Sequence, residues 1–203
     1  MDLSRASFVR EAPDVRRQAL IDATARCLAE RGIAGTSVRA ICATAGVSSG
    51  LLTHYFDGID ALIVATYRDF GRRVGEAIDS AVLAAGPDPR DRLESYVLAS
   101  FVPPVLDPDM LAAWSAFWSL VKSSPAMAKA HEETYAEYRR GIGTHIAALS
   151  PSMDENTVRL ATIGIAALVD GLWLELCLDS RTFTIAEAQQ LARDGISVWV
   201  DRH

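Results

Sequence analysis

The sequence predicts an all-α protein with an N-terminal three-helix head and a C-terminal helical bundle. Apolar residues recur at helical spacing along most of the chain, and no stretch shows the period-two alternation of a β-strand. Gly and Pro residues divide this pattern into segments of helical length. Half of the 203 residues are hydrophobic, which is enough for a folded core.

The first helix is expected over residues 14–31, with four residues along one face: Leu20, Thr24, Cys27 and Leu28. Gly32 is predicted to end this helix. Residues 1–12 are expected to form an arm. Arg5 and Arg10 either contact phosphate there or lie in a frayed terminus.

Residues 36–56 show the pattern of two short helices joined by a tight turn. The first helix begins at Thr36-Ser37, and Gly46 supplies the positive φ that ends it. Ser48 is a favourable N-cap for the second helix. The apolar residues of that helix are Leu51, Leu52, Tyr55 and Phe56. The pattern fits an ordinary αα-corner, or a helix-turn-helix whose second helix enters a DNA major groove.

Longer helices are expected in the rest of the chain, because Gly-Pro, Pro-Pro and Ser-Pro pairs break its helical periodicity. Their predicted ranges are residues 60–85, 88–102, 108–122, 125–148, 155–178 and 185–200.

The net charge of −6 is unevenly distributed. Residues 1–56 carry seven Arg and five acidic residues, a net charge of +2, which leaves −8 on residues 57–203. A mildly basic head on an acidic body is typical of a DNA-binding protein, although so weak a charge predicts modest non-specific affinity and a shallow salt dependence.

The sequence predicts a cytoplasmic protein with no membrane partner. No stretch approaches the roughly 18 uninterrupted apolar residues of a membrane span, and the N-terminus lacks the apolar core of a signal peptide. The three cysteines, Cys27, Cys42 and Cys177, are too widely separated for a disulfide framework or a Cys-x-x-Cys metal site. We expect small buried hydrophobes at these positions, and neither a metal nor a cofactor.

A longer, ordered set of residues resembles the DNA-binding core of the tetracycline-repressor (TetR) family of bacterial regulators. The set comprises Thr36-Ser37, Ile41, Ala45-Gly46-Val47-Ser48, His54-Tyr55-Phe56 and Leu62. The resemblance implies a DNA-binding domain over residues 1–58 and a ligand-binding and dimerisation domain over residues 59–203. The DNA contacts it implies are Ser37, Arg39, Ser48, Ser49, Gly50, Thr53, His54 and Tyr55.

Two positions depart from the family pattern. Ile59 stands where members often carry a Lys, which removes a phosphate contact. Thr53 stands where they often carry a Tyr, so its reach is shorter. Thr53 and His54 either contact bases or form a solvated helix face.

The predicted bundle contains an aromatic stripe and an acidic residue in an apolar helix. Trp114, Phe117 and Trp118 recur at spacings of three and four, and Asp170 lies close to Trp173. These residues either pack helices together, with Asp170 paired to an Arg, or line a ligand site. Both segments resemble the choline-responsive BetI subgroup of the family. That resemblance implies a small-molecule effector, either a quaternary ammonium or another cationic or apolar compound.

The resemblance also implies a homodimer formed by the last two predicted helices. Their closely packing residues are expected to be Ala161, Gly164, Ala167 and Leu168, with Ile185, Leu191, Ile196 and Trp199. A single short recognition helix reads few bases, whereas two heads about 34 Å apart read a near-palindromic site.

We therefore predict a ligand-responsive transcriptional regulator. It is expected to repress by binding a double-stranded DNA operator as a homodimer and to be released by its effector. The alternative is a dimeric helical small-molecule-binding module with weak or no specific DNA binding. An enzyme is not expected, because His131 and His145 lie in no metal-ligand spacing or nucleophile motif.

Overall fold

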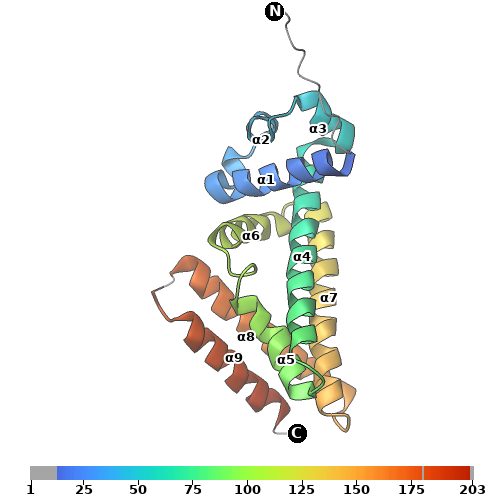
Figure 1. Cartoon of the computed structure of the whole chain (residues 1–203), viewed down its shortest axis with the longest axis vertical. Helices are drawn as coiled ribbons and strands as arrows, with labels where there is room; N and C mark the ends of the chain where they lie inside the picture. Colours follow the sequence, from blue (N-terminus) through green and yellow to red (C-terminus); the bar gives the residue numbers. More distant parts are fainter. Residues whose placement is uncertain (1–12, 180, 202–203) are drawn as a thin grey trace, which may run out of the picture.

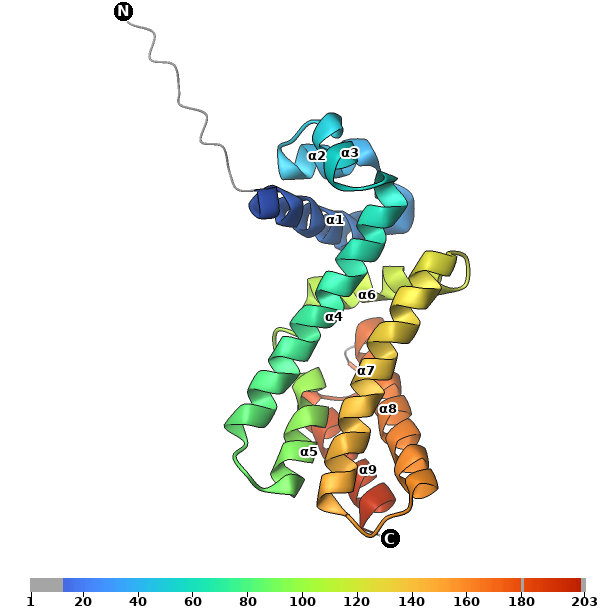
Figure 2. The ribbon, with the colours of Figure 1, turned by 90° about the vertical axis from the view of Figure 1, so that its right-hand side faces the viewer.

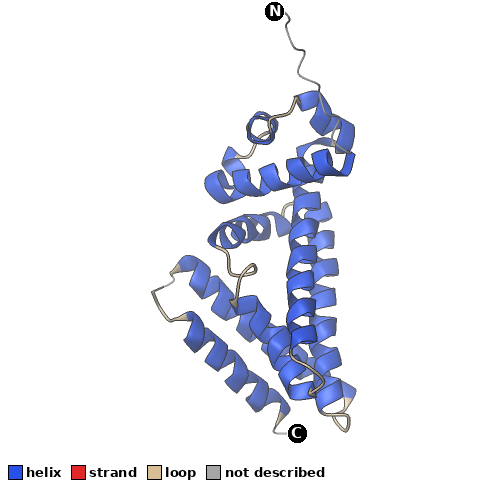
Figure 3. Cartoon of the chain, in the orientation of Figure 1, coloured by secondary structure: helices blue, strands red, loops and turns tan. Residues whose placement is uncertain are grey.

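The helices form a small head and a larger body, joined by the long helix α4 (Gly58–Ala84). The computed structural model of the chain describes residues 13–179 and 181–201, and within these ranges it contains helices and no strand (Figure 3). Figure 1 places the head at one end of the molecule and the C-terminus near the other. The all-α prediction is confirmed. Arg5 and Arg10 lie outside the described residues.

The head consists of α1 (Pro13–Gly35), α2 (Val38–Ala45) and α3 (Ser49–Tyr55). At Gly32 the backbone of α1 leaves helical geometry, with φ 61°, so the predicted end of the helix is a kink followed by a further helical turn. Gly46 ends α2 with a φ of 67°, as its position in the sequence predicts.

The caps of the two short helices differ. The Ser37 hydroxyl accepts a hydrogen bond from the backbone N–H of Ala40 at 3.2 Å and caps α2. Ser48 occupies the N-cap position of α3 in an extended conformation, but its side chain makes no capping hydrogen bond. Ser48 therefore occupies the predicted N-cap position, but its hydroxyl group does not cap the helix.

A separate hydrophobic core holds the head together and includes the first turns of α4. Its buried members are Leu20, Ile21, Ala23, Cys27, Ile41, Cys42, Leu52, Phe56 and Leu62. Because Leu62 belongs to α4, any tilt of that helix moves the head as a unit.

The body is built from α4 and the helices that follow it, each close to its predicted range: α5 (Pro89–Leu98), the 3₁₀ helix η1 (Ala99–Phe101), α6 (Pro108–Val121), α7 (Pro125–Leu149), α8 (Glu155–Leu178) and α9 (Ile185–Val200). The predicted helix over residues 88–102 is α5 continued by η1. In Figure 2, α4 and α7 run the length of the body, and α6 lies across its upper end beneath α1.

The outward surface of α8 and α9 is strongly apolar. The stretch Glu155–Leu176 is long and apolar enough to cross a membrane by length and composition alone. In the fold, α8 packs against α7 and α9 and exposes a row of apolar residues at helical spacing: Leu160, Ile163, Ala167 and Leu174. On α9 the exposed apolar residues are Ile185, Leu191, Val198 and Trp199.

This surface corrects the predicted packing face of the last two helices. Ala161 and Ile196 are buried in the core of the chain itself. Gly164 lies against the Trp199 ring, because a Cβ there would meet the ring at 2.6 Å. Helical spacing alone did not distinguish the side of α8 that faces its own chain from the side that faces outward.

Candidate DNA interface and ligand cavity

The helix α3 presents an exposed polar surface on the head. The side chains of Ser48, Ser49, Thr53 and His54 are exposed, and that of Tyr55 is half-buried against the head core. The His54 and Tyr55 rings meet edge to face, with centroids 4.9 Å apart. Ser49, Thr53 and His54 therefore face outward, and their role in DNA contact stays a prediction.

Two residues of α3, Gly50 and Thr53, offer space and hydrogen-bonding capacity to a close partner. A Cβ added to Gly50 would meet only the Ser48 hydroxyl, at 3.9 Å, so packing within the chain does not require a glycine there. The Thr53 hydroxyl donates to the carbonyl oxygen of its own helix at Gly50, 3.2 Å away. It can still accept a hydrogen bond from a base, and its methyl group suits a thymine.

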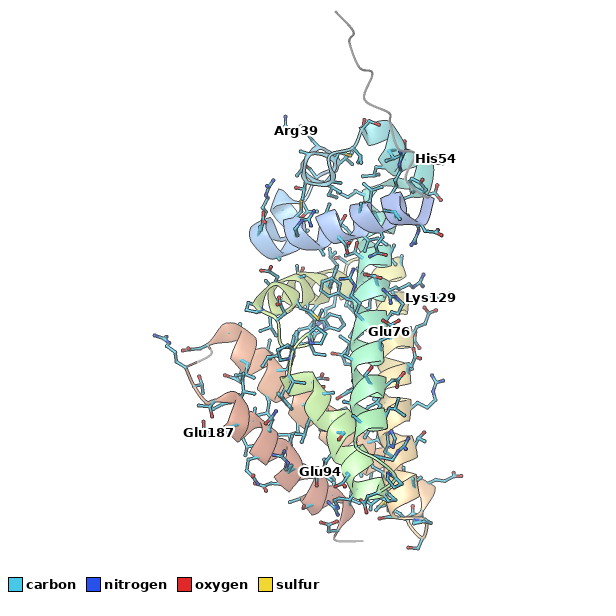
Figure 4. The ribbon with its side chains drawn as sticks, in the orientation of Figure 1. Arg39, His54, Glu76, Glu94, Lys129 and Glu187 are labelled. Carbon is cyan, nitrogen blue, oxygen red and sulfur yellow. The ribbon has the colours of Figure 1, made fainter. Side chains whose placement is uncertain are left out.

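Arg39 and Ser37 at the start of α2 complete this surface. Figure 4 shows Arg39 and His54 on the head, at the end of the molecule farthest from α9. Arg39 is exposed and makes no ion pair with any described residue, so its guanidinium is available to a phosphate or a guanine. Ile59 is half-buried and packs against both the head core and a second hydrophobic cluster that contains Trp114 and Phe117. The Ile59 side chain therefore serves packing within the chain.

The body encloses a cavity of about 160 Å³ between α4, α6, α7 and α8, closed below by α5 and η1. Trp114, Trp118, Asp170 and Trp173 line it, which brings together four of the five predicted ligand residues. Phe117 does not line the cavity. It is fully buried and packs edge to face on Tyr67 and Phe70.

The upper wall of the cavity is aromatic. The Trp173 ring meets Trp114 at 6.2 Å and Trp118 at 6.0 Å between centroids, both edge to face. Trp114 in turn stacks on Tyr67, with centroids 5.2 Å apart. This aromatic cluster continues to Leu28 of α1, so the wall of the cavity and the base of the head share one packed group of side chains.

Asp170 carries the main electrostatic feature of the cavity. Its carboxylate accepts a hydrogen bond from the Tyr135 hydroxyl at 3.3 Å and forms no ion pair among the described residues. Burial raises the pKa of Asp170 to about 6, against weaker lowering by the Tyr135 hydrogen bond and by the charge of Arg139. The predicted alternative of a paired Arg is absent, and the carboxylate faces the cavity.

Sequence reasoning missed the tyrosines of the cavity. Tyr96, Tyr135 and Tyr138 line it, and Tyr96 and Tyr138 stack with centroids 5.8 Å apart. Burial raises the pKa of all three, and that of Tyr96 reaches about 12. The signal available in the sequence was the spacing of Tyr135 and Tyr138 on one helix face. Which neighbour that face meets depends on tertiary packing.

A polar cluster ties the head to α4 above the cavity. We call it the α1–α4 polar cluster, and its members are Gln18 and Asp22 of α1 with Asp69 and Arg73 of α4. The buried Asp69 carboxylate forms an ion pair with Arg73 Nε at 2.7 Å and accepts a hydrogen bond from Gln18 Nε2 at 3.2 Å. It also accepts a hydrogen bond from the exposed Arg72 guanidinium at 2.6 Å. Arg73 also pairs with Asp22. The cavity-lining residues of the same stretch, Gly71 and Gly75, lie on the opposite side of α4.

A head with two short helices that present polar groups outward, on a body with an aromatic cavity and a buried acid, defines a ligand-binding helix-turn-helix regulator. Comparison with protein families agrees with this class. The model of the bacterial regulatory proteins of the tetR family matches residues 20–66. The model of the BetI-type transcriptional repressor C-terminal domain matches residues 89–199. The chain belongs to the TetR family and carries a BetI-type C-terminal domain, and it is therefore a DNA-binding transcriptional regulator.

Individual relatives support the same assignment. The HTH-type transcriptional regulator BetI of Paraburkholderia phytofirmans is 33% identical over 185 residues, which cover 91% of this chain and 93% of that protein. A crystal structure of a protein from Pseudomonas aeruginosa PAO1, described as a transcriptional regulator, is 40% identical. It superposes with a TM-score of 0.83 over 97% of this chain and 94% of its own.

A more distant structure shares the fold. It is that of a Saccharomonospora viridis protein, described as a transcriptional regulator in complex with choline. It is 21% identical, with a TM-score of 0.77 over 91% of this chain and 96% of its own.

Proposed function

We propose that this regulator is a cytoplasmic homodimeric repressor released from its operator by a quaternary ammonium effector, which binds in the aromatic cavity. The observation that carries the proposal is the Asp170 carboxylate, which lies without a cationic partner beside Trp114, Trp118 and Trp173. A buried carboxylate of this kind is costly unless a cation neutralises it. Aromatic faces attract a quaternary ammonium, which needs no hydrogen bonds of its own. The choline bound by the S. viridis protein makes choline the natural first probe.

The position of α4 supports a route from the cavity to the head. Gly71 and Gly75 of α4 line the cavity, and Asp69 and Arg73 on its other side join α1. A ligand that displaces this part of α4 therefore acts on the α1–α4 polar cluster directly. A coupling free energy of about 1–3 kcal/mol between effector and operator is enough for a useful switch.

The apolar surface of α8 and α9 supports the homodimer. Its large exposed side chains include Leu160, Ile163, Leu191 and Trp199, and a second copy of the chain would cover them in a four-helix interface. In such a dimer the two α3 helices read two half-sites. Ser37, Arg39, Ser48, Ser49, Gly50, Thr53, His54 and Tyr55 remain the proposed DNA contacts.

The test is fluorescence anisotropy of the purified protein on DNA from upstream of its own gene, at physiological salt with excess non-specific competitor. We expect specific binding between about 10⁻⁸ and 10⁻¹¹ M. Saturating choline should weaken it by about 5- to 150-fold. Choline binding that leaves operator affinity unchanged contradicts the switch. If the protein binds choline but binds specifically neither to the upstream DNA nor to genomic fragments, the result favours the alternative of a small-molecule-binding module without specific DNA binding.

A further inference from the structure

The cavity has two chemically different ends. Tyr135 and Asp170 are hydrogen-bonded across its middle, from α7 and α8. Tyr138 lies one turn beyond Tyr135, and Trp173 lies one turn beyond Asp170. Because α7 and α8 are consecutive helices that run side by side in opposite directions (Figure 2), Tyr138 and Trp173 fall on opposite sides of the Tyr135–Asp170 pair.

Contacts with the neighbouring helices confirm this polarity. Trp173 meets Trp114 and Trp118 of α6, beneath the head. Tyr138 stacks on Tyr96 of α5, at the far end of the body. The upper end is thus an aromatic enclosure beside the half-buried Asp170 carboxylate. The lower end is lined by the hydroxyl-bearing residues Tyr138 and Ser100, with the exposed carboxylates of Asp79 and Glu137 nearby.

The lower end contains an unsatisfied polar group. Among the described residues, two buried side-chain polar atoms lack a hydrogen-bond partner, and they are the Tyr138 hydroxyl and Trp173 Nε1. Both residues line the cavity. Ser100 is near enough to lower the pKa of Tyr138 against the raising effect of burial, but the two hydroxyls are outside hydrogen-bonding geometry. A buried hydroxyl left without a partner costs free energy, and a bound ligand can remove that cost.

We propose that Tyr138 and Ser100 form a hydroxyl subsite that binds an oxygen function of the effector. This inference rests on the proposed function, because it places the ligand's cationic group at the Trp114–Trp118–Trp173 end beside Asp170. The effector class is then a quaternary ammonium compound that carries a hydroxyl or carbonyl oxygen a few bonds from its nitrogen. Simple alkylammonium ions leave the Tyr138 hydroxyl unpaired and bind more weakly.

The chain offers a matched control for this role. The Tyr96 hydroxyl also lies at the lower end, but it already donates to the backbone carbonyl oxygen of Tyr138 at 3.0 Å. Tyr96→Phe and Tyr138→Phe each remove one hydroxyl from the same stacked pair of rings. Only Tyr138→Phe removes a hydroxyl that has no partner within the chain.

The experiment compares choline with propyltrimethylammonium, in which a methyl group replaces the hydroxyl. Dissociation constants are measured by isothermal titration calorimetry for the wild type and for Tyr138→Phe, Tyr96→Phe and Ser100→Ala. Thermal melts confirm that each variant is folded. We expect the wild type to prefer choline by about tenfold. The preference should fall to about one in Tyr138→Phe, decrease in Ser100→Ala and persist in Tyr96→Phe.

The outcomes separate this inference from the proposed function. Equal binding of the two probes by the wild type, or a choline preference that survives Tyr138→Phe, overturns the hydroxyl subsite and leaves the cation site in place. Failure of both probes to bind the wild type overturns the quaternary ammonium site itself.

Discussion

The head and the cavity differ in how far their polar side chains are exposed to water. On α3 the polar groups of Ser49, Thr53 and His54 are exposed. In the cavity, burial raises the pKa of Asp170 and of the tyrosines around it, and the Tyr138 hydroxyl lacks a partner. The polar groups of the head are exposed to water on a small rigid core, where a large polyanion can contact them. The cavity keeps Asp170 and its three tyrosines wholly or partly away from water, where a small ligand gains most from pairing with them.

The difference implies that substitutions at the two sites have different effects on binding and on stability. A polar residue of the head acts only when DNA is present, so its loss should leave stability unchanged. A polar residue of the cavity carries a desolvation cost in the free protein, so its loss changes both ligand affinity and stability. The predictions below test this contrast.

The largest effect is expected for Asp170→Asn on the binding of a cation. Removing the charge of a desolvated pair costs roughly 2–5 kcal/mol, so choline affinity at pH 8 should fall at least 30-fold by calorimetry. In the wild type, affinity should rise with pH as Asp170 ionises near pH 6. Glu137→Gln is the control, because this cavity carboxylate is exposed and its loss should change affinity less than threefold. Equal losses in the two variants contradict the assignment.

The next effect is on stability, and its sign follows from the raised pKa of Asp170. The folded-state pKa of about 6 lies above the ordinary value of 3.8, so the contribution of Asp170 to the free energy of unfolding is greatest below pH 4 and is lost as pH rises through 6. At pH 8 the ionised carboxylate costs up to roughly 3 kcal/mol. Urea unfolding at fixed protein concentration should therefore find Asp170→Asn more stable than the wild type at pH 8 and equal to it at pH 4. A variant less stable at pH 8 would show that Asp170 has a charged partner.

In the head, Arg39→Ala should weaken operator binding by roughly 1–3 kcal/mol without changing the melting temperature. The control is Arg140→Ala, which removes the same charge from an exposed position on α7 in the body. Anisotropy titrations at several salt concentrations separate a specific contact from a general charge effect. Similar losses in both variants would show that only net charge matters.

A smaller effect is expected for Asp69→Asn in the α1–α4 polar cluster. The variant keeps the cavity and the α3 surface intact but weakens the buried link between Arg73 and Gln18. The coupling free energy between choline and the operator should decrease by roughly 1 kcal/mol, so the ratio of operator affinities without and with choline should fall about fivefold. Glu133→Gln is the control, because the ion pairs of Glu133 are with the exposed Arg68 and Lys129, which are not members of the cluster. An unchanged ratio in Asp69→Asn would place the coupling in the aromatic cluster instead.

The smallest effect is expected for Ile59→Lys. A new cation at this position should increase DNA affinity a few-fold at low salt and steepen the log–log salt dependence by about 0.9. Ile59→Gln loses the same apolar packing without adding charge, so it separates the two contributions. If the glutamine variant binds DNA as tightly as the lysine variant, position 59 is too far from phosphate to matter.

Local patterns predicted the elements of the fold well, because helix ends depend on nearby residues. Gly46 ends α2 and the prolines start α5, α6 and α7 much as their positions predict. The head differs from these expectations at Ser48, whose hydroxyl does not cap α3, and at Gly32, where α1 kinks and then continues. Contacts beyond the helix decide whether a glycine ends it or only bends it.

The sequence by itself determined that the chain is helical, that its head carries an exposed polar helix, and that Trp114, Trp118, Asp170 and Trp173 are candidates for one site. Helical spacing cannot say which neighbour a face meets. Only the tertiary structure placed Phe117 in the core, turned Ala161 and Ile196 inward and brought Tyr138 opposite Ser100. Periodicity is a property of one helix, whereas a cavity depends on how several helices pack, through contacts between residues far apart in the chain.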